Sequence, residues 1–121
     1  MNNFDKTLKE FITVIKETKE YTSYKAADMI FKSDKEASKL LEEFQSSQQT
    51  LQIFRQGNFP GVDEQERKVR ELYRKVQNSR AIMDWAKSQG KLQAFIGDLA
   101  TELTNQINFP FTLPQKGGCC G

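Results

Sequence analysis

Residues 78–107, with the sequence NSRAIMDWAKSQGKLQAFIGDLATELTNQI, decide the fold of this chain. Apolar side chains recur along this stretch at alternating intervals of three and four residues, which is the pattern of one buried face of an α-helix. Either Asn78 or Ser79 is suited to cap the start of this helix. At a rise of about 1.5 Å per residue, a helix that runs to residue 107 is roughly 43 Å long. Because a lone chain of 121 residues does not need such a length, we expect another subunit to complete the fold. The single tryptophan, Trp85, lies in the apolar face and is expected in the core.

The N-terminal part of the chain has the same helical periodicity. One apolar stripe predicts a first helix over about residues 2–20, and its members are Phe4, Leu8, Phe11, Ile12 and Ile15. The residues at 21–23 weaken this pattern. Beyond them, a short second helix is predicted from the apolar residues between Tyr24 and Phe31.

Turn signals delimit the two helices in the middle of the chain. The sequence Ser33-Asp34-Lys35-Glu36 is typical of a capping box, in which the Ser33 hydroxyl accepts a hydrogen bond from the Glu36 amide. A third helix is therefore predicted to begin near residue 34. Gly57 suits the position just after its end, and residues 58–61 are predicted to form a turn. Asp63 is predicted to restart a fourth helix.

These patterns predict an all-α fold, in which long antiparallel helices form a hairpin or bundle that oligomerisation completes. The helical domain is expected over residues 1–108. Each proline disfavours the helical conformation of the residue before it, so the segment Phe109-Pro110-Phe111-Thr112-Leu113-Pro114 is not expected to be helical. Residues 109–121 are expected to form an extended, flexible Pro/Gly tail that ends in Cys-Cys-Gly.

The composition excludes several classes of protein. The chain contains no histidine, which excludes histidine-based acid–base catalysis and histidine-ligated metal sites. A net charge of +2 is too small for a protein that coats nucleic acid. No Gly-rich phosphate loop is present. We expect no signal peptide, because residues 1–10 carry four charges, and no membrane span, because the apolar runs are short. We therefore expect a non-enzymatic protein of the cytoplasm that does not bind membranes.

Arginines follow one side of the predicted fourth helix. Arg67, Arg70 and Arg74 recur at helical spacing, and Arg80 follows them. Such a stripe is suited to contact RNA phosphates or an acidic partner. The alternative is a solvated face with ion pairs between residues four apart. The pairs that favour this alternative are Asp63–Arg67, Glu64–Lys68, Glu66–Arg70 and Glu71–Lys75, which leave only Arg74 and Arg80 without a partner.

A strip of small residues follows the last helix, beside its large apolar face. Its members fall within about 80° of one another at 100° per residue, and they are Ala86, Gly90, Ala94, Gly97, Thr101 and Thr104. A glycine inside a helix costs about 1 kcal/mol relative to alanine. Close approach of a helix from another subunit would explain two such glycines. We therefore predict an oligomer interface formed by Ala86, Gly90, Ala94, Gly97 and Thr101. The alternative is that both are tolerated surface glycines or mark a kink.

The reactive chemistry of the chain is confined to Cys119 and Cys120. Thiolates favour iron–sulfur clusters, zinc or Cu(I). A four-thiolate site needs four sulfurs, so one chain supplies at most half of the ligands. A second chain would have to complete the site. The alternatives are a tail with free reactive thiols and an intermolecular disulfide formed on oxidation.

Three segments carry a resemblance to a known family. They are Tyr24-Lys25-Ala26-Ala27 together with residues 33–44, the run from Leu51 to Gly57, and Asn78-Ser79-Arg80-Ala81-Ile82-Met83-Asp84-Trp85. Over about residues 4–107, helix order and length also resemble the YlbF/YmcA family of small helical bacterial regulators.

The resemblance implies an all-α fold that forms dimers or higher oligomers through its long helices. It also implies a non-enzymatic adaptor in a multi-protein complex that steers ribonuclease Y in RNA maturation, and so affects competence, biofilm and sporulation. That complex holds [4Fe–4S] clusters, for which Cys119 and Cys120 are the only residues here that match cysteine ligands.

The predicted function is therefore a helical adaptor that oligomerises and binds protein subunits of a regulatory complex. The competing hypothesis is a redox, iron–sulfur or metal-binding protein whose thiol tail is displayed by a helical scaffold.

Overall fold

The structure is a computed structural model in which residues 2–108 are described. These residues form helices and no strand, which confirms the predicted all-α class. The helices are α1 (Asn3–Lys16), α2 (Lys19–Ser33), α3 (Lys35–Gly57), α4 (Val62–Gln77) and α5 (Arg80–Ile107). None of these helices is long and apolar enough to cross a membrane. The predicted Pro/Gly tail, 109–121, lies outside the described residues.

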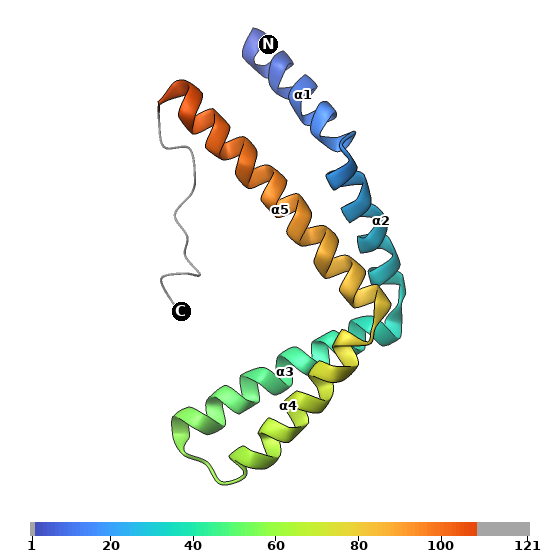
Figure 1. Cartoon of the computed structure of the whole chain (residues 1–121), viewed down its shortest axis with the longest axis vertical. Coiled ribbons are helices and arrows are strands. Elements are labelled where there is room, and N and C mark those ends of the chain that lie inside the picture. The colour runs from blue at the N-terminus through green and yellow to red at the C-terminus, as the bar shows by residue number, and fades with distance from the viewer. Residues whose placement is uncertain (1, 109–121) are drawn as a thin grey trace.

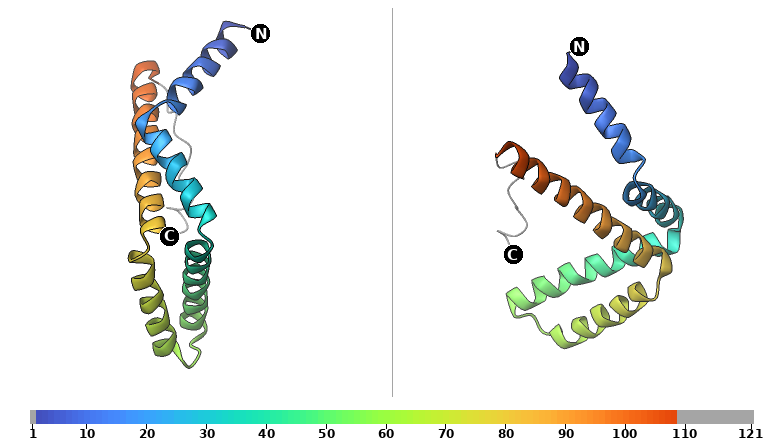
Figure 2. Two further views of the ribbon diagram at one scale, coloured as in Figure 1. Left: turned by 90° about the vertical axis from the view of Figure 1, so that its right-hand side faces the viewer. Right: turned by 45° about the horizontal axis from the view of Figure 1, so that its top comes forward.

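The helices are arranged as a V with two arms (Figure 1). In one arm, α3 and α4 pack against each other as an antiparallel hairpin. In the other arm, α2 packs antiparallel to α5, and α1 continues beyond α2. The α2–α3 and α4–α5 junctions meet at the vertex. Seen from the side, the arms lie one above the other in a narrow layer (Figure 2). The predicted antiparallel hairpin is therefore present, and it is followed by a second pair of helices at an angle.

The hydrophobic core lies at the vertex, where four helices meet. Its buried residues come from α2, α3, α4 and α5, and they are Phe31, Ala37, Val76 and Ile82. Trp85 packs against this cluster, which confirms its predicted place in the core. Ile82 is 3% exposed, whereas no large side chain of α1 is buried. The core cluster is small because the α2–α5 arm and the α3–α4 arm contact each other only near the vertex.

The first break in the helices lies earlier than predicted. The chain turns at Glu17 and Thr18, so the prediction of one helix over residues 2–20 is wrong. Thr18 has an extended backbone, and its hydroxyl oxygen accepts a hydrogen bond from the Tyr21 amide at 3.2 Å. This cap begins α2 at Lys19, before the residues at 21–23 that were predicted to interrupt the helix.

The caps of α3 also differ from the prediction. Asp34, not Ser33, is the N-cap, and its carboxylate accepts from the Ala37 amide at 3.0 Å. Ser33 is the last residue of α2, so its backbone is helical and its hydroxyl donates to the Ile30 carbonyl instead. At the other end, Gly57 is still helical and Asn58 takes the left-handed conformation with a φ of 52°. Asparagine tolerates this conformation because its short polar side chain bonds locally.

The remaining helix ends agree with the sequence patterns. α4 begins at Val62, one residue before the predicted start at Asp63. Ser79 rather than Asn78 caps α5, through a hydrogen bond from the Ile82 amide to its hydroxyl oxygen. The last helix then runs to Ile107, as predicted.

Candidate protein-interaction surfaces

A polar clamp joins α2 to α5 beside the core. Asp28 is 6% exposed, and its carboxylate accepts a hydrogen bond from the Trp85 indole nitrogen at 2.9 Å. Lys32, one turn further along α2, forms an ion pair with the same carboxylate at 2.9 Å. The Trp85 ring stacks on Phe31 with the ring centroids 4.7 Å apart. These contacts fix the side of α5 that faces α2 and thereby decide which side stays exposed.

The clamp also shifts the acidity of both charged groups. The hydrogen bond from the Lys32 ammonium lowers the pKa of Asp28, and the bond from the Trp85 indole lowers it further. The same hydrogen bond to Asp28 raises the pKa of Lys32. The sequence patterns did not single out Asp28, and Ile30, one of the apolar residues from which helix α2 was predicted, is exposed. Two signals pointed to Asp28, namely the four-residue spacing to Lys32 and the need of a buried indole N–H for an acceptor.

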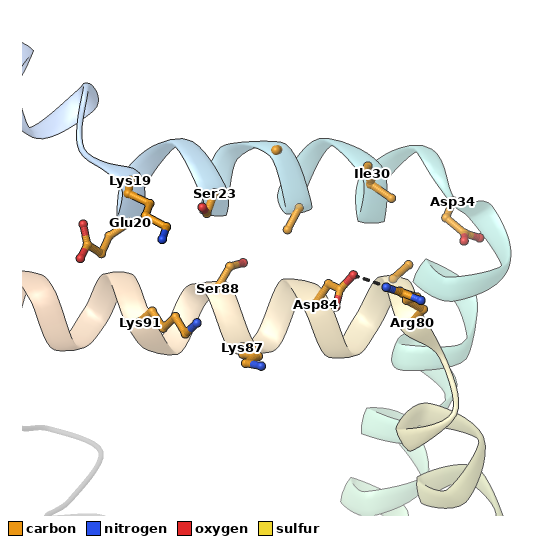
Figure 3. Close-up of a pocket in the computed structure, with 13 residues that line it drawn as sticks. Lys19, Glu20, Ser23, Ile30, Asp34, Arg80, Asp84, Lys87, Ser88 and Lys91 are labelled. Atoms are coloured by element: carbon orange, nitrogen blue, oxygen red, sulfur yellow. Dashed lines mark ion pairs between the residues drawn. The ribbon is translucent and has the colours of Figure 1, made fainter.

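A groove runs between α2 and α5 on one side of the clamp (Figure 3). Its apolar lining includes Ala26, Ala27, Ile30 and Ala81. Charged residues lie along both edges, and they are Lys19, Glu20, Asp34, Arg80, Asp84, Lys87 and Lys91. Among the described residues, neither Lys87 nor Lys91 forms an ion pair. An open groove whose apolar lining residues are mainly small has the shape of a protein-contact surface rather than of an enclosed substrate pocket.

A separate uncovered apolar surface is the apolar face of α1, which we define as Phe4, Leu8, Phe11, Ile12 and Ile15. The first four are between 41% and 71% exposed, and Ile15 is half-buried. Within the described residues, α1 packs only against α2. The outer half of α5 adds three exposed apolar side chains, which are Ile96, Leu103 and Ile107.

The small-residue strip of α5 is open to solvent. Its members from Ala86 to Thr101 are exposed, and Thr104 is half-buried. A Cβ atom added at Gly90 or Gly97 would meet nothing within 4 Å. The strip lies away from Trp85, whose indole nitrogen bonds Asp28 of α2. No packing within residues 2–108 explains the two glycines, and the oligomer interface stays a prediction.

The arginine stripe of α4 is exposed, but its surroundings differ from those expected. Arg67, Arg70 and Arg74 are all exposed. Between the ends of α4, none of the four predicted pairs is an ion pair, and Glu66 instead pairs with Arg55 of α3. Arg80 has no acidic residue four positions before it, and it instead pairs with Asp84, four positions after it, at 3.7 Å. Contact of these arginines with RNA or an acidic partner stays a prediction.

The predicted thiol site lies outside the described part of the chain, because Cys119 and Cys120 belong to residues 109–121. Within residues 2–108, the fold gathers no group of three or more Cys, Asp or Glu side chains suited to hold a metal ion. A cluster shared between chains therefore stays a prediction.

Two comparisons with known proteins agree with this architecture. A family model described as "Control of competence regulator ComK, YlbF/YmcA" matches residues 5–108. A solved structure, the X-ray crystal structure of Bacillus subtilis RicA in complex with RicF, is similar with a TM-score of 0.75 at 16% sequence identity. The similarity covers 87% of this chain and 93% of that chain, and it shows the shared fold. A comparison with curated proteins finds no match.

Proposed function

Since the chain belongs to the YlbF/YmcA family, we propose that it is a non-enzymatic adaptor that binds a protein partner through the apolar face of α1. The family description, control of a competence regulator, supports a regulatory role rather than a catalytic one. The finer role that we propose is regulation of ribonuclease-linked RNA processing in the cytoplasm. We further propose that the chain associates with itself through the small-residue strip of α5.

The exposure of the α1 face is the observation that carries the adaptor proposal. An amphipathic helix gains most of its stability by burying its apolar face, and an isolated helix of 14 residues is marginal in water. Phe4 and Phe11 are 71% and 41% exposed. Contiguous apolar surface of this kind marks a protein–protein contact. A partner that covers α1 would therefore supply the packing that the chain itself does not provide.

The spacing of these residues defines the chemistry of the partner. Phe4, Leu8, Phe11 and Ile15 recur at intervals of three and four residues, which is the anchor pattern of a helix that lies in an apolar groove. The partner surface should therefore be an apolar groove, formed by its own helices or jointly with the outer half of α5. RicA, whose fold is similar, has been solved in a complex with RicF, and this supports partner binding by the fold.

The test replaces apolar anchors on α1 and leaves the core untouched. Leu8→Ser combined with Phe11→Ser should weaken binding at least about tenfold, because truncating a central anchor costs about 2 kcal/mol or more. The matched control is Lys6→Ser combined with Glu10→Ser, which places two serines on the opposite side of the same helix without changing the net charge. Binding to purified ribonuclease Y and to the other purified YlbF/YmcA-family chains of the same cell is measured by sedimentation velocity.

Unfolding by urea should distinguish a contact residue from a core residue. Neither Leu8 nor Phe11 is buried, so the serine variant should unfold close to the wild-type midpoint. Unchanged binding by the folded serine variant, or equal losses in the variant and its control, would contradict the proposal.

A further inference from the structure

The exposed side of α5 carries opposite charges in its two halves. Lys87 and Lys91 lie in the first half, whereas Asp98 and Glu102 lie in the second half, which contains no lysine or arginine after Lys91. At 100° per residue, these four residues fall within about 60° of one another and form one row along the helix. All four are exposed. We name them the charged row of α5.

The charged row is unfavourable within a single chain. Lys87 and Lys91 repel each other at a separation of four residues, and so do Asp98 and Glu102. Among the described residues, none of the four forms an ion pair, and Glu102 accepts only a hydrogen bond from the Gln106 amide at 2.8 Å. In the same helix, Arg80 and Asp84 have opposite signs at this spacing and do pair. No ion pair within the described residues therefore offsets the repulsion along the row.

The positions of the four charges are symmetric about the point between Ala94 and Phe95. Lys91 lies as far before this point as Asp98 lies after it, and the same holds for Lys87 and Glu102. Antiparallel helices related by a two-fold axis place residues at equal distances from that axis beside each other. A second copy of α5, centred on this point, would therefore place each lysine of the row beside an acidic residue.

The small-residue strip lies next to the charged row, where a second helix would approach. Gly90 and Gly97 lie on either side of the same central point, and a Cβ atom at either position would meet nothing within the chain. Alanine is the better helix former, so two glycines with free space around them lack a reason within the monomer. The close passage of a second helix backbone is such a reason, and it keeps the charged side chains within reach of each other.

We propose that two copies of the chain pair their α5 helices in antiparallel orientation about a two-fold axis that passes between Ala94 and Phe95. This pairing rests on the proposed self-association. In this register, Lys91 pairs with Asp98 of the second copy, and Lys87 pairs with Glu102 of the second copy. If the partner were a helix with charges of only one sign, half of the charged row would face charges of its own sign. The row therefore fits a second copy of this chain better than an acidic or a basic partner. Charge pairs at the edge of such an interface fix the register.

Charge reversal followed by charge exchange tests the register. Lys91→Asp places two acidic residues side by side in both symmetric positions, and it should weaken self-association at least about tenfold, because facing like charges cost energy. Lys91→Asp combined with Asp98→Lys exchanges the two signs and should restore association to within about threefold, since each pair is again opposite. The association constant is measured by sedimentation equilibrium at low salt on the full chain.

Monomer stability provides the control for this experiment. Lys91→Asp removes the repulsion from Lys87 and should leave the isolated helix as stable or more stable, so misfolding cannot explain weaker association. The helical circular dichroism of Lys91→Asp should therefore equal or exceed that of wild type.

The outcomes separate the register from self-association itself. Gly90→Leu combined with Gly97→Leu should abolish association if the strip is the seam, whatever the register. A wild-type chain that stays monomeric at all concentrations would overturn the proposed self-association. Association that is lost in the leucine variant but unaffected by Lys91→Asp, or not restored by the exchange, would overturn the antiparallel register alone.

Discussion

At the residue scale, Asp28 is the buried charge that orients α5 on α2. Its carboxylate accepts the indole N–H of Trp85 and pairs with the ammonium of Lys32, each at 2.9 Å. A buried carboxylate without such partners would be strongly disfavoured. The clamp lies beside the stacked rings of Phe31 and Trp85, so its geometry also positions an aromatic pair of the core. The side of α5 opposite Trp85 is thereby left free for other chains.

The lowered pKa of Asp28 predicts how stability depends on pH. The hydrogen bond from Lys32 lowers this pKa below its ordinary value of 3.8, so the stability that the charged form supplies is present above that value. It is lost as the pH falls through the lowered pKa of the folded chain. Asp28→Asn should therefore destabilise the protein at about pH 7 and much less near pH 2.5. Urea unfolding of the variant and of wild type at both pH values measures this difference.

The control for this prediction is Asp84→Asn, which removes the exposed ion pair to Arg80. An exposed pair contributes little, so its loss should change stability less than the loss of the Asp28 charge at about pH 7. An effect of Asp28→Asn that is the same at both pH values would contradict the role of its charge.

At the element scale, one residue ends α2 and begins α3. The Asp34 amide donates to the carbonyls of Ile30 and Phe31, both at 3.1 Å, while its side chain caps the next helix. The extended backbone of Asp34 thus turns the chain at the vertex without a loop. Because both helices contribute to the core there, this single turn sets where the two arms diverge.

The corrected cap can be tested by a matched pair of alanine variants. Asp34→Ala should destabilise the chain by about 1 kcal/mol, the typical cost of removing an N-cap side chain. Ser33→Ala should change stability by less than about 0.5 kcal/mol, because exposed substitutions away from caps and cores have small effects. Urea unfolding compares the two variants. A larger loss for Ser33→Ala than for Asp34→Ala would restore the capping box expected from the sequence.

At the scale of the whole molecule, the V leaves much of its apolar surface uncovered. α1 packs only on α2 within the described residues, and the outer half of α5 exposes Ile96, Leu103 and Ile107. By contrast, Phe31 and Ile82 are buried where four helices meet. Leu51 of α3 and Leu72 of α4 are also buried, so the outer ends of the arm formed by α1, α2 and α5 are the regions that a partner would stabilise.

Hydrogen exchange should follow this division. Amides of α1 should exchange with an opening free energy close to zero in the isolated chain, because few packed contacts hold that helix. Amides near Phe31 and Ile82 should exchange only through global unfolding. Exchange measured by mass spectrometry on the purified chain distinguishes the two regions. Equal protection of α1 and of the vertex in a monomeric sample would show that α1 is stabilised without a partner.

The sequence by itself determined the order of the helices, the end of α5 and the family, because these depend on neighbours within a few turns of the same helix. Apolar spacing was enough to place α5, and its resemblance to the YlbF/YmcA family agrees with the family match. The apolar stripe of α1 has the same spacing and yet is exposed, whereas the small side chain of Ala37 is buried at the vertex.

Only the tertiary structure decided which faces are covered. Periodicity identifies an apolar face but not the distant helix that covers it, and residues 28 and 85 are brought together only when α2 packs on α5. The dependence on distant helices also explains why two surfaces of the chain stay exposed. The small-residue strip and the apolar face of α1 are visible in the sequence, but the arrangement of the arms is what leaves both open to other chains.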